Sequence, residues 1–82
     1  MIYRAVPRRY RTSDGVRYTG YDVIGQEDGL DTLRVEDVTE DARFARLLCA
    51  ALNREQAEPV HVLDIISDFL ADSQWKNSLL SP

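Results

Sequence analysis

Three polar side chains in the C-terminal half have a spacing that could serve catalysis or metal binding. His61, Asp64 and Asp68 are separated by three and four residues, which places them along one face of a helix. Such a set could hold a metal ion, or a carboxylate could orient the imidazole as a general base. The solvated polar face of an amphipathic helix explains the same pattern, and the chain has no second histidine. We favour the polar face and predict no catalytic or metal-binding residue.

Two further signals for chemistry are weak. Cys49 is the only cysteine, so no internal disulfide can form, and His61 is its only potential imidazole partner for nucleophilic catalysis. Cys49 lies at the margin of an apolar helical stripe, where cysteine usually acts as a small hydrophobic residue. The four glycines are scattered without the spacing of a phosphate-binding loop. We therefore expect a non-enzymatic protein without a cofactor.

The N-terminal region combines arginine with tyrosine, which suits single-stranded nucleic acid because arginine binds phosphate and tyrosine stacks on bases. Residues 1–20 carry five arginines and one aspartate, a net charge of +4, whereas residues 21–82 carry five basic and thirteen acidic side chains, a net charge of −8. The low overall pI of about 4.8 and the absence of a nucleic-acid-binding motif argue against that function. The candidate interaction residues are Arg4, Arg8, Arg9, Tyr10, Arg11 and, in the C-terminal tail, Trp75.

The first third of the chain has the pattern of a β-hairpin. Residues 2–11 are rich in strand-forming types, and Asp14-Gly15 is a strong signal for a tight turn. A second strand is predicted over residues 16–26. Its apolar phase shifts near Gly20, for which a β-bulge or a bend is the simplest explanation.

The rest of the chain predicts one short strand and two helices. Residues 32–38 could form the third strand, and a helix capped by Thr39 should run to about residue 53. A second helix, from Pro59 to about residue 71, has the widest apolar arc. It should contact both the sheet and the first helix, and we expect it to be the core of the fold. Residues 1–72 then form one domain, and residues 73–82 form a tail that is frayed or docks on a partner.

Part of the chain resembles a family of short proteins from clostridia and related gut bacteria, known only as a domain of unknown function. Three segments carry the resemblance: Tyr-Asp-Val-Ile at 21–24, Val-Glu-Asp-Val-Thr-Glu-Asp at 35–41, and the helical segment 59–70, which includes Asp64 and Asp68. At the first segment the family has Tyr-Gly-Val or Tyr-Gly-Ile, so Asp22 is a departure from its pattern. The resemblance implies a bacterial origin and supports the architecture, but it implies no activity or ligand.

These observations together predict a small α+β domain. It should contain an antiparallel sheet of two or three strands, in the order β-β-(β)-α-α, with two helices packed on one face. The leading functional hypothesis is a protein-interaction or regulatory domain that binds a protein partner or a second copy of itself. The alternative is single-stranded nucleic-acid binding through the N-terminal hairpin. With no membrane-spanning stretch and no signal peptide in the sequence, we expect a cytoplasmic protein.

Overall fold

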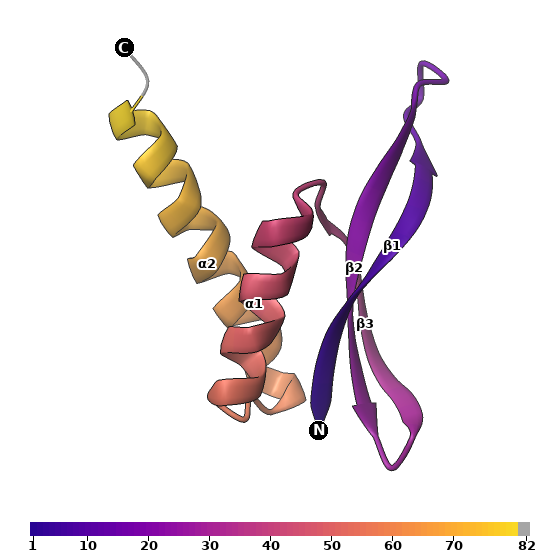
Figure 1. Ribbon diagram of the computed structural model, residues 1–82, viewed down its shortest axis with the longest axis vertical. Coiled ribbons are helices and arrows are strands. Elements are labelled where there is room, and N and C mark those ends of the chain that lie inside the picture. The colour runs from indigo at the N-terminus through magenta and orange to yellow at the C-terminus, as the bar shows by residue number, and fades with distance from the viewer. Residues whose placement is uncertain (81–82) are drawn as a thin grey trace.

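The computed structural model describes the backbone of residues 1–80 and the side chains of residues 1–71. It contains a three-stranded antiparallel sheet in the order β1-β2-β3, followed by two helices on one side of the sheet (Figure 1). This confirms the predicted α+β class, and the third strand is present. The elements are β1 Ile2–Arg11, β2 Arg17–Glu27, β3 Leu30–Thr39, α1 Ala42–Arg54 and α2 Pro59–Leu80. Among the described residues, neither helix is long and apolar enough to cross a membrane.

Both hairpin turns follow from their residue types. At the β1–β2 turn, Gly15 adopts a φ of 84° and its N–H donates to the carbonyl of Thr12 at 3.0 Å. At the β2–β3 turn, Asp28 and Gly29 have φ values of 52° and 80°, the pair of positive angles that a two-residue primed turn requires. The predicted hairpin turn at Asp14-Gly15 is therefore confirmed.

The irregularity of the sheet lies in β3 rather than at Gly20. The β1–β2 register is continuous from Ile2 to Arg11, so the predicted bulge at Gly20 is wrong. The register of β2 with β3 shifts instead, and Asp37 takes a φ of 51° beside the shift. The apolar side chains of β2 switch from even to odd positions because Tyr18 and Val23 lie on opposite faces of the sheet.

The first helix starts two residues later than the predicted cap implies. Asp41 is the N-cap, and its carboxylate accepts hydrogen bonds from the N–H groups of Arg43 at 2.9 Å and Phe44 at 3.1 Å. Thr39 still belongs to β3, and its hydroxyl accepts from the N–H of Asp41 at 3.1 Å. A carboxylate at this position also complements the positive end of the helix dipole.

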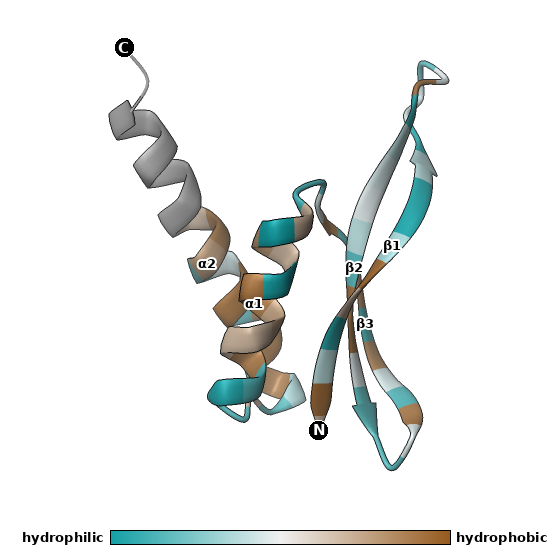
Figure 2. Cartoon of the chain, viewed as in Figure 1, coloured by the Kyte–Doolittle hydropathy of each residue, from teal (hydrophilic) through white to brown (hydrophobic). Residues whose placement is uncertain are grey.

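The core forms mainly between the sheet and α1. Its buried residues come from β1, β2, both helices and their linker: Tyr3, Val23, Leu48, Cys49, Leu52, Ala57, Val62 and Ile66. The second helix joins this core through Val62 and Ile66 but packs mainly against α1, while its Val60 and Leu63 are exposed. The central helix is thus α1, not α2 as its apolar arc suggested. Figure 2 shows hydrophobic residues where sheet and helices meet and hydrophilic residues on β1 toward the β1–β2 turn.

Candidate functional site

The two faces of the sheet have different roles. On one face, Tyr3 and Val23 are buried beneath the helices. Because side chains alternate along a strand, Arg8, Tyr10 and Asp22 lie on the opposite, helix-free face, which we call the open face.

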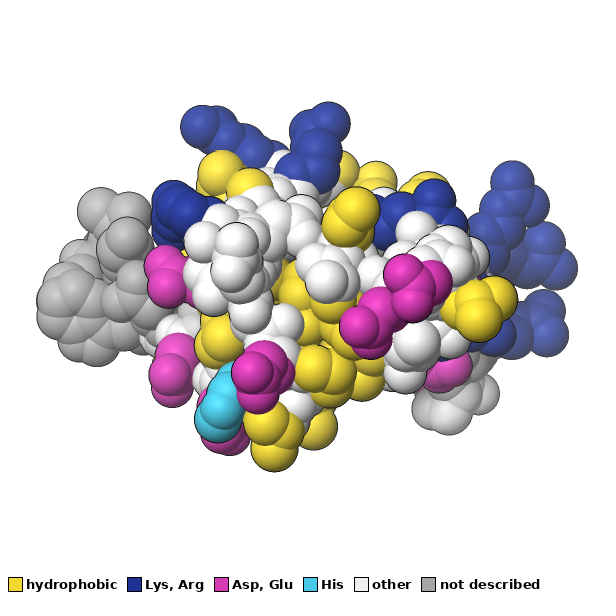
Figure 3. All heavy atoms as spheres, turned by 90° about the horizontal axis from the view of Figure 1, so that it is seen from below, with side chains coloured by type: hydrophobic (Ala, Val, Ile, Leu, Met, Phe, Trp, Pro, Cys, Tyr) yellow, Lys and Arg dark blue, Asp and Glu magenta, His cyan; other side chains and the backbone are white. Residues whose placement is uncertain are grey.

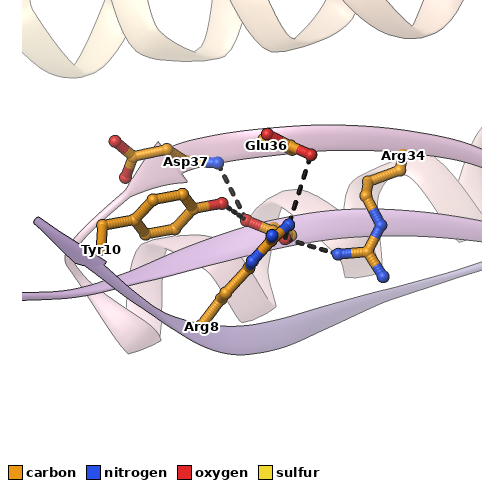
Figure 4. Close-up of polar contacts among 6 residues, drawn as sticks. Arg8, Tyr10, Arg34, Glu36 and Asp37 are labelled. Carbon is orange, nitrogen blue, oxygen red and sulfur yellow. Dashed lines mark hydrogen bonds and ion pairs between the residues drawn. The ribbon is translucent and has the colours of Figure 1, made fainter.

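Asp22 lies at the centre of a polar network on the open face (Figure 4). Its side chain is fully buried, but both of its carboxylate oxygens accept hydrogen bonds from residues of the two neighbouring strands. Oδ1 accepts from the Tyr10 hydroxyl and from the backbone N–H of Asp37 at 2.9 Å. Oδ2 accepts from Nη1 of Arg34 at 2.8 Å and lies 3.8 Å from Nη1 of Arg8.

The protonation state of Asp22 follows from these contacts. Burial by itself raises the pKa of a carboxyl group. Here the N–H of Asp37, the Tyr10 hydroxyl and the Arg34 guanidinium outweigh burial, so the pKa of Asp22 lies below its ordinary value. Asp22 is therefore ionised at neutral pH and serves as an acceptor that holds three strands together.

Two tyrosines extend the network toward the β1–β2 turn. Tyr10 and Tyr18 are cross-strand partners, and their rings stack with centroids 5.7 Å apart. The Tyr18 hydroxyl donates to Oδ2 of Asp37 at 2.6 Å, and this bond, together with burial, raises the pKa of Tyr18 to about 12. Burial and the bond to Asp22 also raise the pKa of Tyr10. Both hydroxyls are fixed, which holds both rings in place.

The end of the β1–β2 hairpin extends past α1 (Figure 1). Here the face opposite the open face is basic. Arg9 pairs with Thr19 and Arg11 pairs with Arg17, on the face that continues the helix-covered side of the sheet. Arg9, Arg11 and Arg17 are exposed, and among the described side chains none of them forms an ion pair. We call residues 9–11 and 17–19 the hairpin end.

A pocket of about 480 Å³ lies at the hairpin end. Within the part of the chain whose side chains are described, no acidic residue lines it; its lining residues are Arg9, Tyr10, Arg11, Arg17, Tyr18 and Thr19. Figure 3 shows basic side chains gathered along the upper and right-hand borders of the view, while most acidic side chains and the histidine lie below. Such a site can bind an anion through guanidinium groups.

The predicted interaction residues are divided between the two faces. Arg4, Arg8 and Tyr10 belong to the open face, whereas Arg9 and Arg11 belong to the basic face of the hairpin end. Arg8 is partly neutralised, since it also approaches Oε1 of Glu36 at 3.3 Å and lies over the Tyr10 ring at 5.6 Å. The Trp75 side chain is outside the described residues.

The weak candidates on α2 point to solvent. His61, Asp64 and Asp68 are exposed. His61 and Asp64 border a shallow hollow of about 640 Å³ that also includes Glu55 and Glu58. Among the described residues, no three His, Cys, Asp or Glu side chains are placed to hold a metal ion. The hollow therefore offers an acidic surface without convergent ligands.

Cys49 is poorly placed for nucleophilic chemistry. Its side chain is buried in the core, and burial raises its pKa to about 11. Because the thiolate is the reactive form, a thiol with this pKa is almost wholly protonated at neutral pH.

Little in the sequence indicates the Asp22 network. The one available signal is a lone carboxylate between Tyr21 and Val23, inside the most apolar part of β2. Arg34 and Asp37 could not be assigned as its partners until the pairing of β2 with β3 was known.

Comparison with known proteins gives no relative: no family model, no curated protein and no solved structure matches this chain. The resemblance to the clostridial family stays a prediction.

Proposed function

We propose that this chain is a non-enzymatic interaction domain that binds an anionic partner through the hairpin end. The observation that carries the proposal is that Arg9, Arg11 and Arg17 share one exposed face without a carboxylate partner among the described residues. Three unpaired guanidinium groups this close together repel one another, and an external anion would relieve that repulsion.

The polar network next to the hairpin end supports a binding rather than a catalytic role. The Asp22 carboxylate is occupied by donors and shielded from solvent, so it cannot accept a proton from a substrate. The tyrosines that contact carboxylates hold their protons more tightly than usual. Such groups fix the shape of a surface but do not exchange protons near neutral pH.

The anionic partner could be an acidic protein surface, a nucleic acid or a second copy of this chain. For self-association, an acidic surface is available on α2 and the residue before it, where Asp64, Asp68 and Glu58 are exposed. A domain of this kind would act as a regulatory or adaptor component. The buried free thiol suits the reducing environment of the cytoplasm, where we place the protein.

Heparin, a generic polyanion, tests the proposal. The variant with Arg9→Gln, Arg11→Gln and Arg17→Gln should elute from immobilised heparin at clearly lower salt than the wild type. The matched control is Arg43→Gln, Arg46→Gln and Arg54→Gln, which removes the same charge from exposed positions of α1. Equal losses for the two triple variants, or no heparin binding at low salt, would overturn the proposal. Light scattering of the same samples reports whether a second copy is the partner.

A further inference from the structure

We infer that the anionic partner is a single strand of nucleic acid, whose phosphates contact the basic face of the hairpin end and whose bases stack on the face of the Tyr18 ring turned away from Tyr10. The inference rests on the proposed function above and specifies its ligand. It follows from the juxtaposition of arginines and fixed aromatic rings on the two faces of one narrow ribbon.

The basic face has the spacing of a phosphate-binding row. Arg9 and Arg11 are two residues apart on β1, which separates their Cα atoms by roughly 6.8 Å. Arg17 stands opposite Arg11 on β2, about 5 Å away across the strands. These separations are comparable to those between neighbouring phosphates of a nucleic-acid strand. All three cations are arginine, whose planar fork binds phosphate through two parallel hydrogen bonds.

The opposite face offers a prearranged stacking surface. An added Cβ at Gly20 would come within 3.1 Å of the Tyr10 ring, so the ring lies close against the strand at this residue. Both tyrosines are only partly buried, and both hydroxyls are tied to carboxylates. Stacking on rings already held in place costs little side-chain entropy, and every base can stack.

An acidic protein partner accounts for only half of these features. It would explain three free arginines, but it gives no role to an aromatic pair held beside them. A nucleic-acid duplex fits less well for a different reason. Residues 21–82 carry a net charge of −8, and a duplex is too stiff to bend away from that acidic body. A flexible single strand can follow the hairpin end alone.

The first test compares four labelled probes by fluorescence anisotropy at low salt. They are an oligothymidylate of about 12 nucleotides, within the roughly 4–16 nucleotides that such sites span, an abasic strand of equal length, a duplex, and a polyglutamate of equal charge. The strand with bases should bind about tenfold more tightly than each of the others. If the abasic strand, the duplex or polyglutamate binds equally well, the single-strand inference is wrong while the proposed function stands. If no probe binds, both are wrong.

The second test separates stacking from charge. Tyr18→Phe and Tyr18→Leu both remove the hydroxyl bonded to Asp37, but only phenylalanine keeps an aromatic ring. The phenylalanine variant should bind the oligothymidylate within about twofold of wild type, and the leucine variant should bind it about fivefold more weakly. Neither change should alter binding of the abasic strand. Equal affinities of the two variants would overturn the inference.

A readout on the wild-type protein keeps the inference testable should the leucine variant fail to fold. The fluorescence of a strand containing 2-aminopurine should change on binding as the base stacks on an aromatic ring. Binding without such a change would count against stacking.

Discussion

The backbone N–H of Asp37 donates a hydrogen bond of 2.9 Å to Oδ1 of Asp22, linking β3 to β2 at a point where their register shifts. Asp37 reaches this position with a φ of 51°, a conformation in which Asp and Asn are enriched among residues other than glycine. Its own carboxylate then accepts from Tyr18. The bulge in β3 thus contributes a donor to one carboxylate and an acceptor to one tyrosine.

Replacing Asp22 should destabilise the domain strongly. In Asp22→Asn, the amide nitrogen cannot accept a hydrogen bond, and Arg34 loses its charged partner. Leaving a buried hydrogen-bond network partly unpaired typically costs about 1–3 kcal/mol of unfolding free energy. Urea unfolding followed by circular dichroism measures the loss. Asp14→Asn, which makes the same chemical change in an exposed turn, should stay within about 0.5 kcal/mol of wild type. Similar costs for the two variants would contradict the central role of Asp22.

The same carboxylate should make stability dependent on acid pH. Its pKa in the folded protein lies below the ordinary value of 3.8, so folding favours the ionised form. Its contribution is complete above 3.8 and disappears as the pH falls through the folded-state pKa. The difference in unfolding free energy between wild type and Asp22→Asn should therefore shrink in this acid range. A difference that stays constant between neutral pH and pH values below 3.8 would show that the charge of Asp22 is not what stabilises the fold.

Local signals were sufficient for the architecture but not for the network. Asp14-Gly15 and Pro59 mark a turn and a helix start by their own backbone preferences, so these features could be predicted. The role of Asp22 depends on which residues of β1 and β3 stand beside it. That register is set partly by a bulge containing Asp37, a residue without a distinctive local signal.

At the candidate site, too, some residues could be predicted from the sequence and others only from the strand register. Arg9, Tyr10 and Arg11 could be named from the sequence because they form a run of arginine and tyrosine. Only the strand register places Arg17 and Tyr18 opposite them. Which helix is central to the core could not be predicted, because a wide apolar arc indicates burial in general, whereas α2 leaves Val60 and Leu63 exposed.

The Tyr18 hydroxyl should ionise at a higher pH than that of an ordinary tyrosine. Its pKa is about 12, because the phenolate would lose its hydrogen bond to Asp37 and face that carboxylate. The neutral ring therefore stabilises the fold fully below the ordinary pKa of 10.0, and this contribution is lost as the pH rises toward 12. The ultraviolet absorbance of the phenolate measures the titration, and the difference between wild type and Tyr18→Phe isolates this residue. A difference curve with a midpoint near 10 would refute the prediction.

A side chain at Gly20 should force the Asp37 carboxylate to move. An added Cβ would come within 2.3 Å of Oδ1 of Asp37 and 3.1 Å of the Tyr10 ring. Gly20→Ala would displace the exposed Asp37 carboxylate and shift the Tyr10 ring slightly, and we expect a loss of about 1 kcal/mol in unfolding free energy. Combining it with Asp37→Ala removes the closest contact, so the cost of Gly20→Ala should be smaller in that background. Strictly additive costs would show that the two residues do not interact.

A single side chain of α1 should hold the start of β1. Oδ1 of Asn53 accepts from the N–H of Tyr3 at 2.7 Å, and Nδ2 of Asn53 donates to the carbonyl of Tyr3 at 2.9 Å. Asn53→Ala removes both bonds, and we expect a cost of about 1–2 kcal/mol in unfolding free energy, with faster hydrogen exchange at the Tyr3 amide.

Asn53→Asp tests whether the donor matters. Aspartate can still accept from the N–H of Tyr3, but it has no donor for the carbonyl and brings a negative charge close to it, so it should not restore stability. Arg54→Ala, an exposed change at the next position, should leave both stability and Tyr3 exchange within about 0.5 kcal/mol of wild type. If Asn53→Ala behaves like Arg54→Ala, the start of β1 is held by the sheet and by the Tyr3 hydroxyl bonded to the carbonyl of Ala57, without help from Asn53.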